Sequence, residues 1–294
     1  MNKYVLLSVI YLLSGLESFE QPISPITTPS FDYHKDFKAI LAQTKADTSE
    51  LYYDKLLGRF LLNDTSLTKA QTLALMIGFT EDPNYKPLED METELEIFEH
   101  NKSAEFHEAI EKGRPFLETH PLSLLVLREV SFAYNRLGKD YSKNSQFDSA
   151  VICQDSSKYF MDLNDKIMEA MIYSGKGRRT DNPIFSLGLA DGEYFLPNVG
   201  YEIEKKATDW NRDKDFMEII QVVNNQAVNI NYYFVIQHAK EKIDNDKANA
   251  MANKKKIKTP AKKKIKEKSS SKKKTTNLIP IIEPIATDSI PAIN

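Results

Sequence analysis

The sequence predicts an α+β protein, in which an antiparallel helical part precedes an antiparallel β-meander. The first supporting observation is helical periodicity over residues 31–180, where apolar side chains recur three and four residues apart, as in Phe37, Ile40 and Leu41. The second is a change to alternating apolar and polar residues over 181–243, which is typical of strands. We expect both stretches to form one domain.

Cap-forming and helix-breaking residues divide the helical part. Residues 64–68 are rich in cap-forming residues, and Thr68 is predicted to begin a helix because its hydroxyl can accept from an unpaired backbone N–H. Residues 89–120 are predicted to form two helices that are divided near 101–103. Pro121 is expected to end the second one, since the residue before a proline disfavours helical geometry.

Two further helices are predicted beyond that proline. The first covers 122–137 and is closed by Gly138, a common residue at helix C-termini, and the second covers 142–173. The helices on either side of Pro121 are tetratricopeptide-like, because small residues such as Ala109 let antiparallel helices approach closely. An ordinary antiparallel helix pair explains the pattern equally well. Both interpretations favour protein contact over chemistry.

The β part is predicted from short runs with strand character. Residues 184–189 and 193–196 are two apolar runs, and residues 201–204 alternate in polarity. The two longest runs, 215–223 and 228–238, are separated by a few polar residues and are predicted to form a hairpin.

The N-terminus has the layout of a secretory signal peptide. Lys3 is followed by thirteen residues without a charge and then by small residues, so 1–18 is predicted to be the signal peptide and 19–30 a proline-containing linker. We therefore expect export to the periplasm or the extracellular space. Cys153 is the single cysteine, so a lipoprotein-type anchor near the leader is not expected. A buried thiol of this kind usually fills core space.

Residues 244–294 are predicted to be a disordered basic tail. Twelve lysines and one acid give the stretch from Lys254 to Lys274 a charge of +11. Because the net charge of the whole chain is −3, the remaining residues together carry −14. Without aromatic residues for base stacking, this segment offers charge alone to anionic lipid, lipopolysaccharide, acidic glycan or extracellular nucleic acid. A solvated linker is the alternative. The lysines are Lys254, Lys255, Lys256, Lys258, Lys262, Lys263, Lys264, Lys266, Lys268, Lys272, Lys273 and Lys274.

We expect no metal ion and no cofactor. His107 with Glu111, and Glu96 with His100, are spaced to share a helix face, but no third ligand accompanies either pair. The glycine-rich residues 174–180 resemble a phosphate loop in composition. They follow a helix and precede strands, which is the reverse of the order that such a loop requires. A glycine C-cap explains them more simply.

No catalytic residue is assigned from the sequence. Asp191 and Glu193 flank Gly192 near a predicted strand bend, where two carboxyl groups suggest general acid–base chemistry. With Tyr194 and His238 they would form the site of a hydrolase. A structural Asp-Gly turn is the simpler interpretation.

Three stretches carry a resemblance to a bacterial family known as domain of unknown function number 4919. They lie within 51–68, which contains Leu-Tyr-Tyr and Asp-Thr-Ser-Leu-Thr, within 174–194, and at 231–234. The resemblance covers roughly residues 31–240 and implies an exported protein with tetratricopeptide-like helices and a β-rich end. It adds no mechanism.

The chain departs from the family pattern at two positions. Lys176 stands where an acidic residue is usual between two glycines, and Gly192 stands where histidine is usual before Glu-Tyr. A site formed by those positions in relatives would be damaged here.

Taken together, these features predict a non-enzymatic envelope binding module with a basic tail for anionic surfaces. The module would bind a protein partner through its helical face. The alternatives are a structural protein that self-associates in a salt-dependent way, and the hydrolase near Asp191 and Glu193.

Overall fold

The structure is a computed structural model that describes residues 31–223 and 228–257. The predicted signal peptide, the linker and the lysines from Lys258 onward lie outside the described residues. Lys254, Lys255 and Lys256 lie within a described helix, but only their backbone is described.

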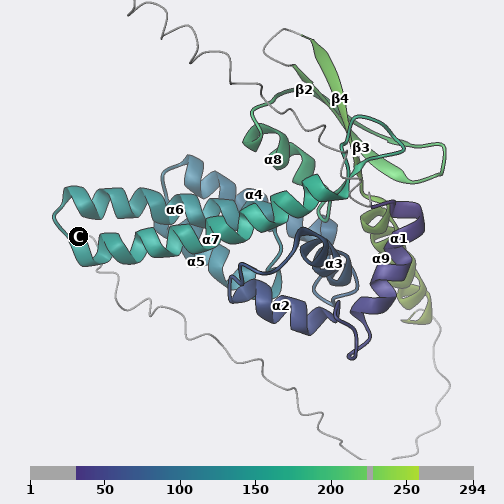
Figure 1. The fold of residues 1–294 in the computed structure, drawn as a ribbon, viewed down its shortest axis with the longest axis horizontal. Helices are drawn as coiled ribbons and strands as arrows, with labels where there is room; N and C mark the ends of the chain where they lie inside the picture. Colours follow the sequence, from purple (N-terminus) through teal and green to yellow (C-terminus); the bar gives the residue numbers. More distant parts are fainter. Residues whose placement is uncertain (1–30, 224–227, 258–294) are drawn as a thin grey trace, which may run out of the picture. The chain divides into compact units, whose positions relative to one another are not determined.

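Helices form the first part of the described chain (Figure 1). The two longest of this part run side by side in the figure and are joined by a short turn. The helices are α1 (Tyr33–Thr44), α2 (Tyr53–Leu61), α3 (Lys69–Phe79), α4 (Pro87–Lys102), α5 (Phe106–Thr119), α6 (Leu124–Lys143) and α7 (Phe147–Ser174).

A mixed four-stranded sheet follows. Its order is β1-β4-β3-β2, in which β2, β3 and β4 form an antiparallel meander and β1 pairs parallel to β4. The α+β prediction is therefore confirmed, with one parallel pairing added. The elements are β1 (Ile184–Phe185), α8 (Asp191–Asn198), β2 (Glu202–Trp210), β3 (Phe216–Val223), β4 (Asn229–Val235) and α9 (Gln237–Ile257).

Local capping explains several helix boundaries. Thr68 begins α3 with a capping box, since its hydroxyl accepts from the N–H of Gln71 while the Gln71 side chain accepts from the Thr68 N–H. Ser123 caps α6 by accepting from the N–H of Val126. The predicted C-cap at Gly175 is confirmed, because α7 ends at Ser174.

Other predicted boundaries were wrong. Helix α6 continues through Gly138 to Lys143, and Gly138 instead lets α7 approach, since an added Cβ would lie 3.2 Å from Cβ of Cys153. Residues 193–196 belong to α8 rather than to a strand. Residues 244–257, expected to lack regular structure, continue α9.

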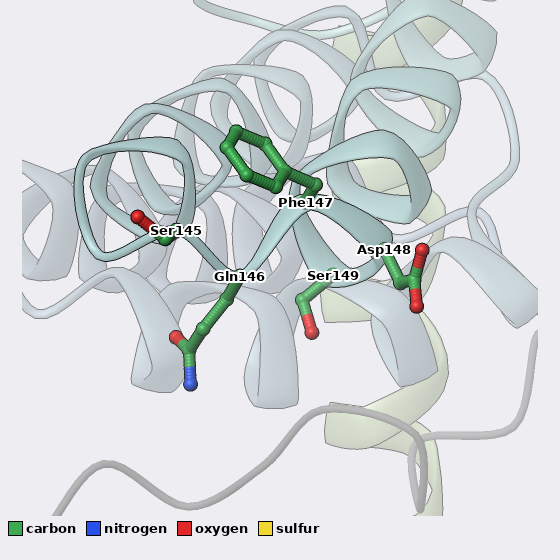
Figure 2. Close-up of a pocket in the computed structure, with 5 residues that line it drawn as sticks. All are labelled: Ser145, Gln146, Phe147, Asp148 and Ser149. Atoms are coloured by element: carbon green, nitrogen blue, oxygen red, sulfur yellow. The ribbon is translucent and has the colours of Figure 1, made fainter.

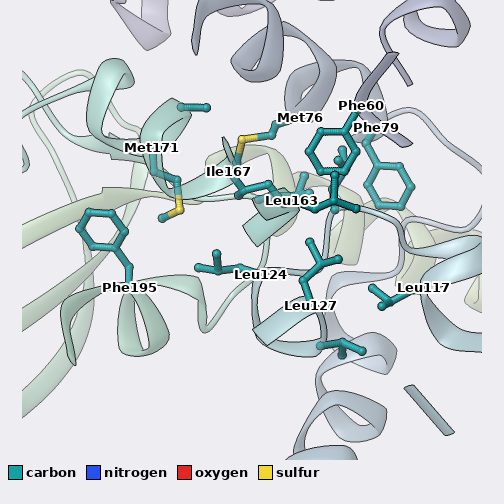
Figure 3. Packing of buried hydrophobic residues seen from close by; sticks show 14 of the residues in the cluster. Phe60, Met76, Phe79, Leu117, Leu124, Leu127, Leu163, Ile167, Met171 and Phe195 are labelled. Carbon is teal, nitrogen blue, oxygen red and sulfur yellow. The ribbon is translucent and has the colours of Figure 1, made fainter. Parts of the chain in front are cut away.

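One hydrophobic core joins the helices to the sheet. Figure 3 shows Phe60 and Met76 near Leu163 and Ile167 of α7, and each of these side chains is at most 2 % exposed. Full burial of such a side chain contributes about 1.5–3 kcal/mol. Cys153 is also buried and free, as expected of a thiol that fills core space.

Candidate functional site

Three carboxyl groups from α4, α8 and β3 lie near one another, of which Asp191 and Glu218 are buried and Glu94 is half-buried. Asp191 is the first residue of α8, and its Oδ2 accepts from the backbone N–H of Gly188 at 2.7 Å. Burial raises the pKa of Asp191 to about 6, although backbone N–H groups of Gly188 and Leu187 and the hydroxyl of Ser186 oppose that shift. Asp191 therefore anchors the loop that enters α8.

Glu94 of α4 approaches the same region. The hydroxyl of Ser123 donates to its Oε1 at 2.6 Å, so Ser123 serves both the α6 cap and this carboxyl group. Burial is the main cause that raises the pKa of Glu94 to about 7, and the nearby carboxylate of Asp191 raises it further.

Glu218 of β3 is the most isolated member of the group. It is 4 % exposed, and its Oε2 has no hydrogen-bond partner. Burial raises its pKa to about 8, and the carboxylates of Glu193 and Asp191 add to the shift. Burial disfavours the charged form of Glu218, because that form would lose its hydration and Oε2 receives no hydrogen bond that would compensate.

These three groups form what we call the carboxyl row: Glu94, Asp191 and Glu218. The raised pKa values of about 6 for Asp191, about 7 for Glu94 and about 8 for Glu218 place the ionisation of these groups near neutral pH. Within the described residues no group of acidic, histidine or cysteine side chains is arranged to hold a metal ion. Proton uptake is the chemistry that this arrangement supports.

The structure brings Asp191, Glu193 and Tyr194 together on α8, so the predicted strand bend was wrong. Glu193 lies at the margin of the row and forms an ion pair with Lys206 of β2. Tyr194 is half-buried, and burial followed by the charge of Glu94 raises its pKa. Sequence reasoning thus found one member of the row and two residues beside it.

His238 does not join the carboxyl groups. Its ring stacks on Phe185 with 4.7 Å between ring centroids and on Phe37 with 5.7 Å. We call these three rings the aromatic cluster. Nε2 lies 3.4 Å from the carbonyl oxygen of Leu187, and Nδ1 has no partner. Burial lowers the pKa of His238 to about 4, so the ring is neutral and packs as a core side chain.

Glu94 and Glu218 were missed by the sequence analysis. Glu94 carries no distinguishing signal, because it is one of several acids on α4. Glu218 does carry one, since it is the single charged residue within the apolar strand β3.

The other motifs have structural roles. In the glycine-rich loop, the N–H of Gly177 donates to the carbonyl of Asn182 and that of Lys176 donates to the Asn182 side chain. These donors are already used within the loop, so they do not form a phosphate cradle. His100 lies 2.7 Å from Glu105 rather than pairing with Glu96.

Two shallow hollows on the described surface lie away from the carboxyl row. One lies at the α6–α7 turn around Ser145–Ser149 (Figure 2). The other, of about 340 Å³, lies between α9 and the sheet and includes Leu189 and Phe216. None of the helices in the described part is long and apolar enough to cross a membrane.

Comparison with known proteins relates this chain to one family. The family model for a domain of unknown function, DUF4919, matches residues 38–245. The chain belongs to this family. No curated protein matches, and no solved structure matches. In this DUF4919 protein the match spans α4, α8 and β3, and so includes the whole carboxyl row.

Proposed function

We propose that this DUF4919 protein is an exported, non-enzymatic envelope binding module. Its lysine-rich segment binds an anionic surface, and its helical part binds a protein partner. The observation that carries the proposal is the separation of charge, +11 within 254–274 against −14 elsewhere. Near an anionic membrane each lysine contributes about 1 kcal/mol, so a segment of this charge supports reversible attachment.

The helical part offers apolar side chains for a partner. Phe147 and Val151 lie one turn apart at the start of α7 and are 67 % and 54 % exposed. Figure 2 shows the Phe147 ring pointing away from Gln146 and Ser149 at the turn. Aromatic and aliphatic side chains that are exposed next to each other favour contact with another protein.

Vesicle binding tests the first half of the proposal. The exported chain, without residues 1–18, should sediment with vesicles that contain phosphatidylserine or lipopolysaccharide, and sediment less with purely zwitterionic vesicles. Changing the twelve tail lysines to glutamine should abolish this binding, whereas changing them to arginine should preserve it. Equal binding by the glutamine and arginine variants would contradict attachment by charge.

Cross-linking in envelope extract tests the second half. The double variant Phe147→Asp/Val151→Asp should lose a partner that the unchanged chain captures. The matched variant Gln154→Asp/Lys158→Asp changes exposed positions further along the same helix and should keep the partner. Retention by both variants would place the contact elsewhere.

A hydrolase near Asp191 and Glu193 is the second candidate. It is favoured by the raised pKa values of Asp191 and Glu94, since a general acid must hold its proton near neutral pH. The burial of Asp191 works against it, because a substrate must reach the acid. Hydrolysis of model glycosides or esters that is lost in Asp191→Asn but not in Glu111→Gln would favour this candidate.

A further inference from the structure

Strand β2 is an open edge of the sheet. It stands last in the order β1-β4-β3-β2, and every residue from Glu204 to Trp210 is exposed. The opposite edge strand, β1, is only two residues long. An edge strand presents alternate N–H and C=O groups that no neighbour within the sheet satisfies.

The covering helix α8 lies on a face of the sheet rather than alongside the outer edge of β2. An added Cβ on Gly192 of α8 would meet Glu218, Ile220 and Phe234, so α8 packs on one face of the sheet, where it contacts β2 as well as β3. It reaches β2 through the ion pair of Glu193 with Lys206. The edge of β2 is therefore accessible along its whole regular part.

The regular part of β2 begins after a bulge. Ile203 pairs with Val222 and Lys205 with Gln221, so Glu204 is an extra residue between them. Beyond it the ladder with β3 is continuous to Trp210. Bulges and lysines on an edge commonly discourage pairing with unrelated strands. A partner must therefore complement the charges of this edge.

A second copy of the same strand provides that complement. In an antiparallel pair related by a two-fold axis, facing residues have their side chains on the same side of the sheet. The axis therefore passes midway between one residue and the same residue of the second copy. With the axis at Ala207, Lys205 faces Asp209 of the second copy and Asp209 faces Lys205. The small Ala207 faces itself, and Lys206 faces Thr208.

The neighbouring registers are poorer. An axis at Lys206 would place two lysines opposite each other, which is unfavourable. An axis at Thr208 would place Lys205 opposite Asn211 and Asp209 opposite Ala207, without an ion pair. The charges of β2 thus select the register centred on Ala207.

We propose that two copies of this chain associate through antiparallel pairing of their β2 strands, centred on Ala207, with reciprocal Lys205–Asp209 ion pairs. The pairing extends the four-stranded sheet into a continuous sheet of eight strands. It also places two lysine-rich segments in one assembly, so that attachment to an anionic surface becomes bivalent. Dimerisation through β2 and surface attachment through the lysine-rich segment do not depend on each other.

Sedimentation velocity on the full-length chain tests the proposal with four proteins. The unchanged chain should form a dimer. Lys205→Glu should weaken dimerisation at least about tenfold, because both ion pairs become repulsive contacts. The double variant Lys205→Glu/Asp209→Lys exchanges the two charges and should restore the dimer. Arg212→Glu makes the same change of charge outside the ladder and should not affect it.

Amide hydrogen exchange adds a structural readout. Exchange in residues 205–210 should slow with concentration in the unchanged chain and in the double variant, but not in Lys205→Glu. A monomer throughout the concentration series would overturn the proposal. So would a dimer that Lys205→Glu leaves intact and that high salt dissolves in all four proteins, because that result assigns self-association to the tail and the acidic body.

Discussion

The backbone of Gly192 in α8 lies directly against the carboxyl group of Glu218 in β3. A Cβ added to Gly192 would lie 2.6 Å from Oε2 of Glu218, 2.8 Å from a ring carbon of Phe234 and 2.9 Å from Cδ1 of Ile220. The absence of a side chain therefore lets α8 approach the sheet and closes the space above the buried carboxyl group. This contact couples the packing of a helix to the ionisation of a strand residue.

Gly192→Ala should destabilise the fold by about 1–3 kcal/mol, since an added methyl group in a filled interface forces α8 away from the sheet. Gly58→Ala is the matched control, because no atom lies within 4 Å of its added Cβ. That change within α2 should stabilise by roughly 0.5–1 kcal/mol, as alanine favours helix. Urea unfolding of both variants checks the prediction, and equal effects would contradict it.

Stability should fall as the pH rises through the range in which Glu218 ionises. The pKa of Glu218 is about 8 in the folded protein, against an ordinary value of 4.5, so the folded state binds more protons between these values. The favourable contribution is complete below the lower value and is lost as the pH approaches the upper one. Each pKa unit corresponds to roughly 1.4 kcal/mol.

Glu218→Gln tests this assignment, because glutamine keeps the shape but does not ionise. The unfolding free energy of the variant should depend less on pH between 5 and 8. Some dependence should remain, since Glu94 and Asp191 titrate in the same direction. Urea denaturation at a series of pH values measures it. An unchanged pH profile would show that Glu218 does not ionise in this range.

Ser123→Ala should cost more than the loss of an ordinary cap. The hydroxyl caps α6 and also donates to Glu94, whereas Thr68 caps α3 away from the carboxyl row. Thr68→Ala should cost about 1 kcal/mol. Ser123→Ala should cost roughly 1–2 kcal/mol more above pH 7, where an ionised Glu94 loses its donor. If the two variants were equally stable at high pH, Ser123 would have no role beyond capping.

The sequence could predict what depends on neighbouring residues. Thr68 and Gln71 are three positions apart, and the residues after Ser174 include two glycines, so both helix termini were found locally. The β3–β4 hairpin was found for the same reason. Helix α8 was missed because Gly192 and Pro197 are poor helix formers, and contact with the sheet outweighs their propensity.

The carboxyl row could not be predicted as a unit. Asp191 was noted because it belongs to an Asp-Gly turn dipeptide. Glu94 lies more than 90 residues before it in the chain, and Glu218 belongs to a separate strand, β3. Their pKa values depend on burial, which arises only when α4, α8 and β3 pack together. The parallel pairing of β1 with β4 was missed because two residues carry no alternation signal.

His238→Phe tests the pH dependence of stability below pH 6.5, as Glu218→Gln tests it at higher pH. The pKa of His238 is lowered from 6.5 to about 4, so the unfolded state binds more protons between these values. The contribution of the neutral ring is complete above the higher value and is lost as the pH falls through the lower one. Phenylalanine keeps the stacking on Phe185 and gives up only the long 3.4 Å contact with the Leu187 carbonyl.

The unfolding free energy of His238→Phe should therefore fall less than that of the unchanged chain between pH 6.5 and 4. Above pH 7 its profile should keep the decline that Glu218 causes. Glu218→Gln should show the opposite behaviour, with the acid decline retained and the alkaline decline reduced. Because Glu218 packs against Gly192 whereas His238 stacks on Phe37 and Phe185, their effects should add in the double variant. A double variant that differs from the sum would indicate that the aromatic cluster and the carboxyl row are coupled.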